Sequence, residues 1–187
     1  MRIILASRSP RRLALLKAAG LTVHVEPSHI NESPIPNETV EDLVLRLARE
    51  KSLMFANAAF PIIAADTLVA LHGQVLGQPD DLDEAFDMIR HLAGHTHEVH
   101  TGICVRYEDK IFSDRVTTRV TFRPISDEEI TNYLEHNDVL DKAGAYAIQA
   151  GASSFITAID GPLDNVIGLP MQRTLQLLSA ARGDKSA

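Results

Sequence analysis

The fold is decided in residues 3–20, which read IILASRSPRRLALLKAAG. The apolar run 3–6 predicts a buried strand that passes directly into a helix. Ser9 has the hydroxyl oxygen of an N-cap, and Pro10 suits the first helical position because its missing N–H would be unpaired there anyway. Gly20 supplies a left-handed stop. These residues therefore predict a strand, a tight junction and a helix.

The junction between this strand and this helix carries anion-binding groups. Its hydroxyl and guanidinium groups come from Ser7, Arg8, Ser9, Arg11 and Arg12. Backbone N–H groups at a helix start attract anions, and arginines add fixed charge and paired donors. Because the chain is otherwise acidic, we interpret the junction as a site for a phosphate or polyphosphate.

Length and composition limit the class of protein. The 187 residues are 45% apolar, which suits one compact domain over 1–187 with room for two lobes. With 18 basic and 25 acidic residues the formal net charge is −7, which argues against stable nucleic-acid binding because that needs a broad basic surface. No apolar stretch approaches the ~20 residues that span a bilayer, so we expect no membrane partner. Cys104 is the single cysteine, which indicates a buried, inert thiol in a cytoplasmic protein.

Apolar periodicity and turn residues place the remaining elements. Thr39 is expected to cap a helix that runs to about Asn57, with Asp42 in a capping-box position. The other predicted segments are strands at 61–71 and 74–76 joined by a turn at His72-Gly73, a helix at 82–92, a hairpin of 98–107 with 110–122, a helix starting at 126, a strand at 153–159 and a final helix opening at 169–170. This alternation predicts an α/β fold with a mixed, elongated sheet and helices on both faces.

Asp66 is the strongest candidate for chemistry. A carboxylate at the end of a buried apolar strand is unfavourable unless something binds it, and ligands of open α/β sheets lie at such strand ends. The alternative is that Asp66 only caps a turn through Thr67. Glu32 lies in a proline-rich loop, where acidic residues are usually solvated, but together with Asp66 it would complete a divalent-metal site. Lys51, on the long helix, is either a surface charge or points inward.

Two further groups of polar residues are candidates for binding. Lys142 and Gln149 bracket a segment of small residues, which favours either close approach of a ligand or a tight packing turn. A glutamine amide can also read the edge of a base. His95, His97 and His100 suggest zinc only weakly, because no further ligand pattern accompanies them, and a solvated strand edge is the preferred interpretation.

Seven blocks of the sequence match a known family in order and spacing. They are Ser7-Arg8-Ser9-Pro10-Arg11-Arg12 with Leu15-Leu16, Arg49-Glu50-Lys51, Ala64-Ala65-Asp66-Thr67, Gly77-x-Pro79, Thr101-Gly102, Lys142-Ala143-Gly144-Ala145-Tyr146-Ala147-Ile148-Gln149, and Asp160-Gly161 with Asn165-Val166-x-Gly168-Leu169-Pro170. In these blocks the chain closely resembles the Maf family over nearly its whole length.

This resemblance implies an enzyme that cleaves nucleoside triphosphates between the α and β phosphates, releasing a nucleoside monophosphate and pyrophosphate. It implies a divalent cation, Mg²⁺ or Mn²⁺, a Maf/ITPase-like fold with a deep cleft between two lobes, and commonly a homodimer. Members of the family are credited with clearing nucleotides from the pool and, under an older name, with inhibiting septum formation.

The resemblance also implies roles for single residues. Asp66 matches the acid–base position, which activates water or holds the metal. Lys51 and Glu32 match positions at the phosphates and the metal. Residues expected to contact the substrate are Ser7, Ser9, Arg11, Arg12, Thr67, Lys142 and Gln149, of which Arg11, Thr67 and Gln149 match positions associated with base preference. Thr67 and the ending at Gln149 resemble the branch that favours dTTP and UTP, with CTP and modified pyrimidine nucleotides as further candidates.

The sequence departs from the family pattern at three positions. Gln78 stands where a lysine is usual, Asn31 where an acid is common, and Ala150 where a glycine is usual. The loss of a phosphate-directed charge at Gln78 supports an alternative function, a nucleotide-sensing regulator of cell division with little catalysis. A third possibility, an RNA-binding adaptor, conflicts with the negative charge.

Overall fold

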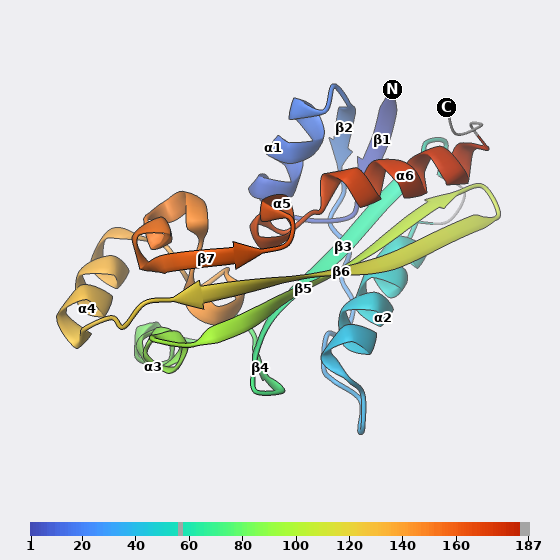
Figure 1. Ribbon diagram of the computed structural model, residues 1–187. Helices are drawn as coiled ribbons and strands as arrows, with labels where there is room; N and C mark the ends of the chain where they lie inside the picture. Colours follow the sequence, from blue (N-terminus) through green and yellow to red (C-terminus); the bar gives the residue numbers. More distant parts are fainter. Residues whose placement is uncertain (56–57, 184–187) are drawn as a thin grey trace. The chain divides into compact units, whose positions relative to one another are not determined.

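The computed structural model describes residues 1–55 and 58–183 (Figure 1). Its strands are β1 (Arg2–Leu5), β2 (Thr22–Val25), β3 (Ile62–Leu71), β4 (Gln74–Leu76), β5 (Thr96–Tyr107), β6 (Lys110–Phe122) and β7 (Ile156–Asp160). Its α-helices are α1 (Pro10–Ala18), α2 (Val40–Leu53), α3 (Leu82–Leu92), α4 (Asp127–His136), α5 (Leu163–Ile167) and α6 (Met171–Arg182). Three short 3-10 helices lie at Ala143–Ala145, Ile148–Ala150 and Ala152–Phe155.

The strands form one mixed seven-stranded sheet, which confirms the predicted α/β class. The order is β2-β1-β3-β5-β6-β7, and β4 pairs with β3. The pairs β1–β2 and β1–β3 are parallel, whereas β3–β4 and β6–β7 are antiparallel. None of the helices in the described part of the chain is long and apolar enough to cross a membrane.

Contacts divide the chain into two compact units. The first unit comprises residues 1–66, 101–116 and 168–187, and the second comprises 67–100 and 117–167. The prediction of a single domain over 1–187 stays a prediction beside this division, as does the cleft between two lobes.

The first unit consists of strands with helices on both faces. Alternate strand residues point to opposite faces, so the apolar run of β3 reflects burial on both sides. In Figure 1, α1 and α6 lie on one side of these strands and α2 lies on the other. The α1 and α6 side contains Ile3, Leu5, Leu16, Leu21, Ile63, Ala65, Ile103, Val105, Leu169, Leu177, Leu178 and Ala181. A smaller cluster on the opposite side contains Ile4, Ala6, Ile62 and Ala64, with Phe55 and Ala58 packed against it.

The predicted junction of strand and helix is confirmed. The Ser9 hydroxyl accepts a hydrogen bond from the Arg12 N–H at 3.4 Å, and Pro10 occupies the first helical position. Gly20 ends the segment with φ +78°. At the start of α2, Thr39 accepts from the Asp42 N–H at 3.1 Å.

Helix α2 ends at Leu53, earlier than predicted. The expectation of a longer helix rested on Met54 and Phe55, which continue the apolar spacing. Met54 is instead 54% exposed, and Phe55 packs against the Ile4 cluster from outside the helix. The predicted end at Asn57 lies outside the described residues.

The second unit has its own core of aliphatic and aromatic side chains. Strands β3, β5 and β6 contribute one face, and α3, α4 and the 3-10 segments cover it. The cluster contains Val69, Leu71, Leu76, Ala85, Met88, Ile89, Leu92, Val99, Val120, Phe122, Ile130, Tyr133, Val139, Ala145, Tyr146, Ala152 and Phe155. The Ser126–Glu129 capping box starts α4 as expected.

Three features of the fold differ from the prediction. The exposed strand β2 and the short helix α5 were not predicted, because neither carries a clear apolar period. The strand expected from residue 153 begins only at Ile156. Gly151, with φ +84°, starts a 3-10 turn that directs the Phe155 ring towards Phe122 and Tyr133.

Asn165 connects α5 to the sheet of the second unit. Its side chain is fully buried, and its amide donates to the Val99 carbonyl at 2.9 Å and to the Thr118 hydroxyl at 3.1 Å. The Thr118 hydroxyl in turn donates to the Pro162 carbonyl at 3.0 Å. A Cβ on Gly161 would lie 2.8 Å from the Thr118 hydroxyl oxygen. The block around Asn165 therefore has a structural role.

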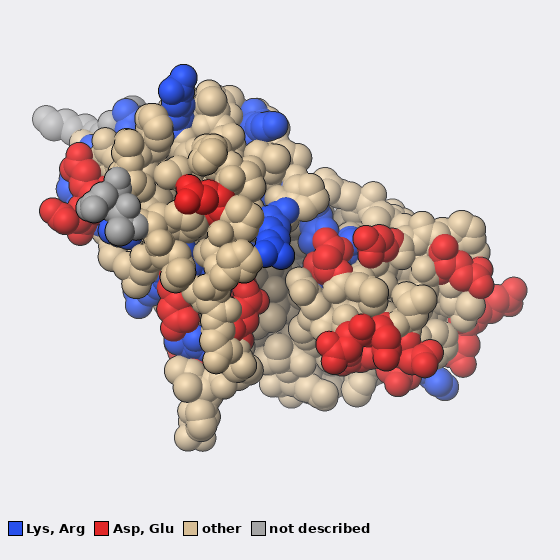
Figure 2. All heavy atoms as spheres, turned by 180° about the vertical axis from the view of Figure 1, so that it is seen from behind, with Lys and Arg blue, Asp and Glu red and all other residues tan. Residues whose placement is uncertain are grey.

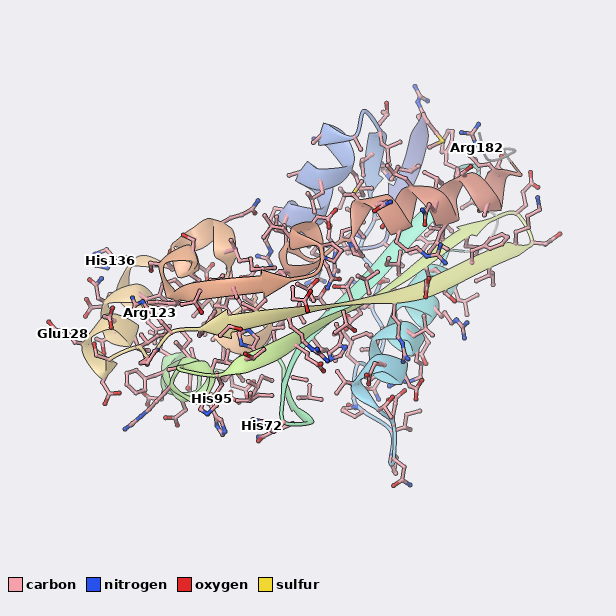
Figure 3. All side chains as sticks on the ribbon, in the orientation of Figure 1. His72, His95, Arg123, Glu128, His136 and Arg182 are labelled. Carbon is pink, nitrogen blue, oxygen red and sulfur yellow. The ribbon has the colours of Figure 1, made fainter. Side chains whose placement is uncertain are left out.

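His97 and His100 on β5, and His95 just before it, contact other side chains of this chain. His97 is buried and its Nε2 lies 2.8 Å from the Tyr146 hydroxyl, while His100 Nδ1 lies 2.9 Å from the Thr117 hydroxyl. His95 is exposed, and its ring meets that of His72 edge to face at 5.7 Å between centroids (Figure 3). The expected solvated strand edge is therefore wrong for His97 and His100, because both side chains are buried and lie within hydrogen-bonding distance of hydroxyl groups.

Replacing Gly102 by alanine is expected to destabilise the protein. A Cβ at this position would lie 2.1 Å from the Val44 carbonyl oxygen, so α2 would have to move off β5. We expect a loss of about 3 kcal/mol in the free energy of unfolding, measured by urea denaturation. Gly77→Ala is the control, since its Cβ would meet nothing within 4 Å. Equal stability of the two variants would contradict the close packing of α2.

His97 is expected to make stability depend on pH. Burial lowers the pKa of His97 to about 4, whereas an unfolded chain has a histidine pKa of about 6.5. Below pH 6.5 the unfolded state therefore binds a proton that the native state does not, and stability falls until about pH 4, by about 3 kcal/mol. His97→Gln should flatten this part of the profile in urea titrations at several pH values. His136→Gln, which removes an exposed histidine instead of a buried one, is the control variant.

Candidate active site

Asp66 forms a buried ion pair with Lys51. The residues Ile62, Ala64 and Asp66 alternate onto the face of β3 that α2 covers, and Asp66 is only 6% exposed. Lys51 lies in the last turn of α2, is also buried, and donates from Nζ to Asp66 Oδ1 at 2.5 Å. Lys51 therefore points inward, which decides between the two alternatives left by the sequence.

Glu32 reaches the same ammonium from the loop before α2. Its Oε1 lies 2.8 Å from Lys51 Nζ, and its side chain is 57% exposed whereas that of Asp66 is 9% exposed. Two carboxylates from separate segments thus converge on one cation. Both carboxylates have oxygens directed to one point, and one of them faces solvent.

The serines and Arg12 form a hydrogen-bonded network at the helix start. Ser7 Oγ accepts from the Ser9 N–H at 3.1 Å and from Arg12 Nη1 at 3.1 Å. Arg12 Nε donates to the Gly168 carbonyl at 2.8 Å. This network ties the junction to the segment before α6. Gly168 lies in one of the seven blocks, but its residue type gives no sign that its carbonyl binds Arg12.

The electrostatics place the junction beside the acidic pair. Burial is the largest effect and lowers the pKa of Arg12, the neighbouring Asp66 and Glu32 carboxylates raise it, and Arg11 lowers it. Arginine stays protonated through such shifts. Arg12 and Lys51 therefore lie within electrostatic reach of the two acids, inside the first unit, and Arg11 lies close enough to Arg12 to act on its charge.

Charge is distributed unequally between the two units. The first unit has 14 basic and 11 acidic residues, whereas the second has four basic and 14 acidic residues. Figure 2 shows acidic side chains gathered over the second unit. An anionic substrate is therefore expected to be bound chiefly by the first unit.

The remaining predicted residues belong to the second unit. Thr67 follows Asp66 on β3 and is half-buried. Lys142 is buried and its ammonium donates to the Asp138 carbonyl and the Asp141 carboxylate. Gln149 is exposed on a 3-10 helix. That these side chains form one site with Asp66 stays a prediction.

Two of the departures from the family pattern have structural roles here. The Gln78 amide donates to the Asp141 carbonyl at 3.1 Å, beside the carboxylate that binds Lys142. Asn31 Oδ1 accepts from the Ser33 N–H at 3.0 Å and so shapes the loop that carries Glu32. Ala150 ends the 3-10 helix before Gly151.

The protein groups that could hold a metal are few. Within residues 1–55 and 58–183, no group of three or more histidine, cysteine, aspartate or glutamate side chains is placed to hold an ion. Cys104 is buried beside the Ser52 hydroxyl at 3.2 Å, and burial raises the pKa of its thiol, as expected for an inert cysteine. The available donors at the site are the carboxylates of Asp66 and Glu32.

Comparison with known proteins identifies the family. The model of the family described as Maf-like protein matches residues 2–181. The chain belongs to the Maf family. Among its Maf relatives is the dTTP/UTP pyrophosphatase of Geobacter sulfurreducens, which is 45% identical over 174 residues, with 91% of each chain covered. The dTTP/UTP pyrophosphatase of Escherichia coli K12 is 42% identical, with 95% of this chain and 91% of the relative covered. Among solved structures, the Ham1 protein of Staphylococcus aureus aligns with a TM-score of 0.47 at 14% identity, covering all of both chains.

Replacing Lys51 by methionine is expected to destabilise this Maf protein strongly. The change leaves the Asp66 carboxylate buried without its cation, which typically costs about 3 kcal/mol or more. Urea denaturation at neutral pH measures the loss. Lys17→Met, at an exposed position of α1, is the matched control and should cost less than about 0.5 kcal/mol. A Lys51→Met protein as stable as the control would show that the pair does not hold α2 to β3.

Proposed function

We propose that this chain hydrolyses dTTP and UTP between the α and β phosphates, releasing the nucleoside monophosphate and pyrophosphate and so clearing the nucleotide pool. One observation carries the proposal: Lys51, Asp66 and Glu32, which match the family's reaction positions, meet in one ionic cluster. Relatives that cover more than nine-tenths of the chain are named dTTP/UTP pyrophosphatases, which supports the same reaction.

Charge neutralisation is the first requirement of this reaction. Phosphoryl transfer depends on positioning and on stabilising negative charge on the phosphate oxygens. Arg11, Arg12 and Lys51 supply three cations, and the N-terminus of α1 supplies oriented N–H groups. Ser7 and Ser9 are hydroxyl donors for the same anion.

Asp66 is proposed to activate the attacking water. Its carboxylate accepts a proton as the water oxygen bonds to the α-phosphorus, and the bond from that phosphorus to the bridging oxygen breaks. Pyrophosphate leaves with the electrons of that bond. Lys51 holds Asp66 in place through the Oδ1 contact and neutralises the phosphates that lie against it.

The acidic pair fits a divalent cation. Mg²⁺ and Mn²⁺ take oxygen ligands, and Mg²⁺ in particular uses one or two carboxylates together with substrate phosphates. Asp66 and Glu32 are proposed as those carboxylates, because both contact Lys51 Nζ and so lie close to each other, and each carboxylate has a second oxygen that does not make this contact. When bound, the cation would neutralise phosphate charge as a Lewis acid.

Selection of the base is assigned to residues outside this cluster. Thr67 and Gln149 are proposed to recognise the pyrimidine by hydrogen bonding, with Arg11 at the same end of the substrate and Lys142 supplying a further cation. CTP and modified pyrimidine nucleotides are further candidate substrates. A cytoplasmic homodimer is proposed as the working form, and light scattering of the purified chain tests its oligomeric state.

Pyrophosphate release from a nucleotide panel tests the activity. With Mg²⁺ or Mn²⁺, we expect release from dTTP and UTP ahead of purine nucleotides. Asp66→Asn should lower kcat by about a thousandfold, within the usual range for a general base, while circular dichroism shows a folded chain. Asp109→Asn, in the exposed β5–β6 turn, is the control.

The panel also separates the enzyme from a nucleotide sensor. Both would show a higher melting temperature with dTTP, but only the enzyme releases pyrophosphate. A wild-type protein that binds dTTP without releasing pyrophosphate would overturn the proposed hydrolysis. A full rate in Asp66→Asn would overturn the role of Asp66 alone.

A further inference from the structure

The loop that carries Glu32 has no regular secondary structure of its own, yet Glu32 must reach a buried ammonium. The chain closes a turn between Ile35 and Glu38, where each residue's N–H is bonded to the other: Glu38 N–H to the Ile35 carbonyl at 3.1 Å, and Ile35 N–H to Glu38 Oε2 at 3.2 Å. Nothing in these bonds alone attaches the turn to α2.

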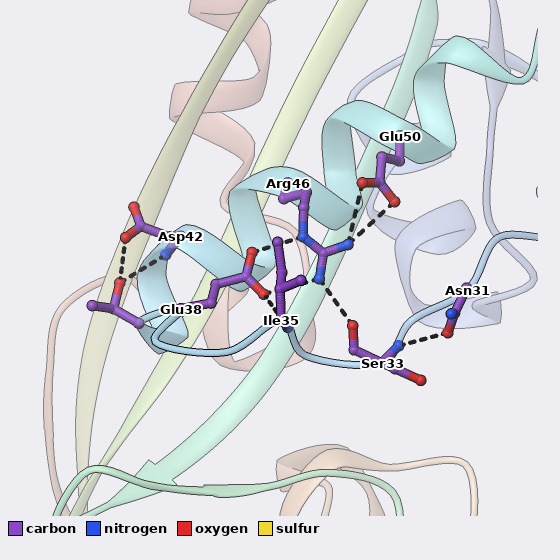
Figure 4. Close-up of polar contacts among 8 residues, drawn as sticks. Asn31, Ser33, Ile35, Glu38, Asp42, Arg46 and Glu50 are labelled. Atoms are coloured by element: carbon purple, nitrogen blue, oxygen red, sulfur yellow. Dashed lines mark hydrogen bonds and ion pairs between the residues drawn. The ribbon is translucent and has the colours of Figure 1, made fainter.

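Arg46 makes that attachment (Figure 4). Its Nε donates to Glu38 Oε1 at 2.7 Å and its Nη2 to Glu38 Oε2 at 2.9 Å, which is a bidentate pair. Nη2 also donates to the Ser33 carbonyl at 3.1 Å, one residue after Glu32. Nη1 donates to both oxygens of Glu50, the residue before Lys51, at 3.2 and 3.3 Å. One guanidinium thus binds the loop, the turn and the helix end that carries Lys51.

The Glu38–Arg46 pair at the centre of this network is partly removed from solvent. The side chain of Glu38 is 6% exposed and that of Arg46 is 22% exposed. The bond from Arg46 is the largest effect on Glu38 and lowers the pKa of its carboxyl, and the same bond raises the pKa of Arg46. Both groups are therefore charged at neutral pH, and a bidentate pair between guanidinium and carboxylate is stronger and more directional than a single ionic hydrogen bond.

We infer that Arg46 is a positioning residue for the metal and phosphate site: it holds residues 31–38 against α2 so that Glu32 lies on Lys51 beside Asp66. The inference rests on the proposed function for its catalytic consequence. Arg46 is bonded to Glu38, Ser33 and Glu50. It acts through Ser33, next to Glu32, and through Glu50, next to Lys51.

A double-mutant cycle tests whether Arg46 acts through Glu32. Arg46→Gln is expected to lower kcat for dTTP by about a hundredfold, the scale of a misplaced reacting group, and to raise the Mn²⁺ concentration for half-maximal rate. KM for dTTP should change by less than about threefold, because the substrate contacts remain. In a Glu32→Gln background, the same substitution should lower kcat by less than about threefold, because coupled residues are not additive. Equal losses in the two backgrounds would overturn the inference.

Two further variants separate position from charge and from general stability. Arg46→Lys keeps the charge but lacks the planar fork that serves Glu38, Ser33 and Glu50 together, so it should be nearly as impaired as Arg46→Gln. Full rescue by lysine would overturn the inference. Arg49→Gln is the matched control, because Arg49 lies on the same helix but donates to Ser113 Oγ at 2.7 Å.

Hydrogen exchange provides a readout that needs no activity. In Arg46→Gln, the amides of Ser33, Ile35 and Glu38, which donate hydrogen bonds within this loop, should exchange faster by about tenfold or more, while those of α1 keep their protection. Binding of Mn²⁺, measured by calorimetry at saturating dTTP, should weaken in this variant, whereas in a Glu32→Gln background the Arg46→Gln change should leave Mn²⁺ binding unchanged. If the wild type released no pyrophosphate, the proposed function would fail, and these two measurements would still decide the role of Arg46. Unchanged exchange in the loop would reject it.

Discussion

The buried contact between Lys51 and Asp66 is the interaction on which the rest of the site depends. Neither charge is stable in the interior without the other, because removing an ion from water is costly unless a partner of opposite charge is held in good geometry. The contact therefore requires β3 to present Asp66 on the face covered by α2, and α2 to end with Lys51 above it. Glu32 and Arg12 are arranged around a pair that the fold already has to hold.

The sequence predicted the local structure well wherever a short-range rule applied. The cap at Ser9, the cap at Thr39 and the hairpin turn at His72 and Gly73 depend on neighbouring residues only, and all three were confirmed. Strand β2 and helix α5 were missed because tertiary pairing, rather than apolar periodicity, holds them. The partners of His97 and His100 could not be predicted either, since they come from other segments of the chain.

In the candidate site, too, the sequence indicated local features but not the contacts between distant segments. The resemblance indicated the residue types, but only the structure shows that Lys51 turns inward and that Glu32 joins it. Arg46 was missed although its spacing to Glu50 is that of a helical ion pair, because its main partner, Glu38, lies in the loop before the helix. The local spacing therefore indicates only the longer bonds of Arg46 to Glu50, and not its shorter bonds to Glu38. Asn165, a residue of a matching block, is by contrast buried and bonded to the sheet at Val99 and Thr118.

The close approach of α2 to Gly102 makes the position of Lys51 sensitive to the tilt of the helix. The helix backbone rests on β5 at Val44, and Lys51 lies seven residues further on, about 10 Å along the axis at 1.5 Å per residue. If α2 tilted by only about 10° about its contact at Val44, the ammonium would move by about 2 Å, most of the length of a hydrogen bond. Because Gly102 has no Cβ, α2 can lie close to β5, and this close packing sets the position of the Lys51 ammonium two turns further along the helix.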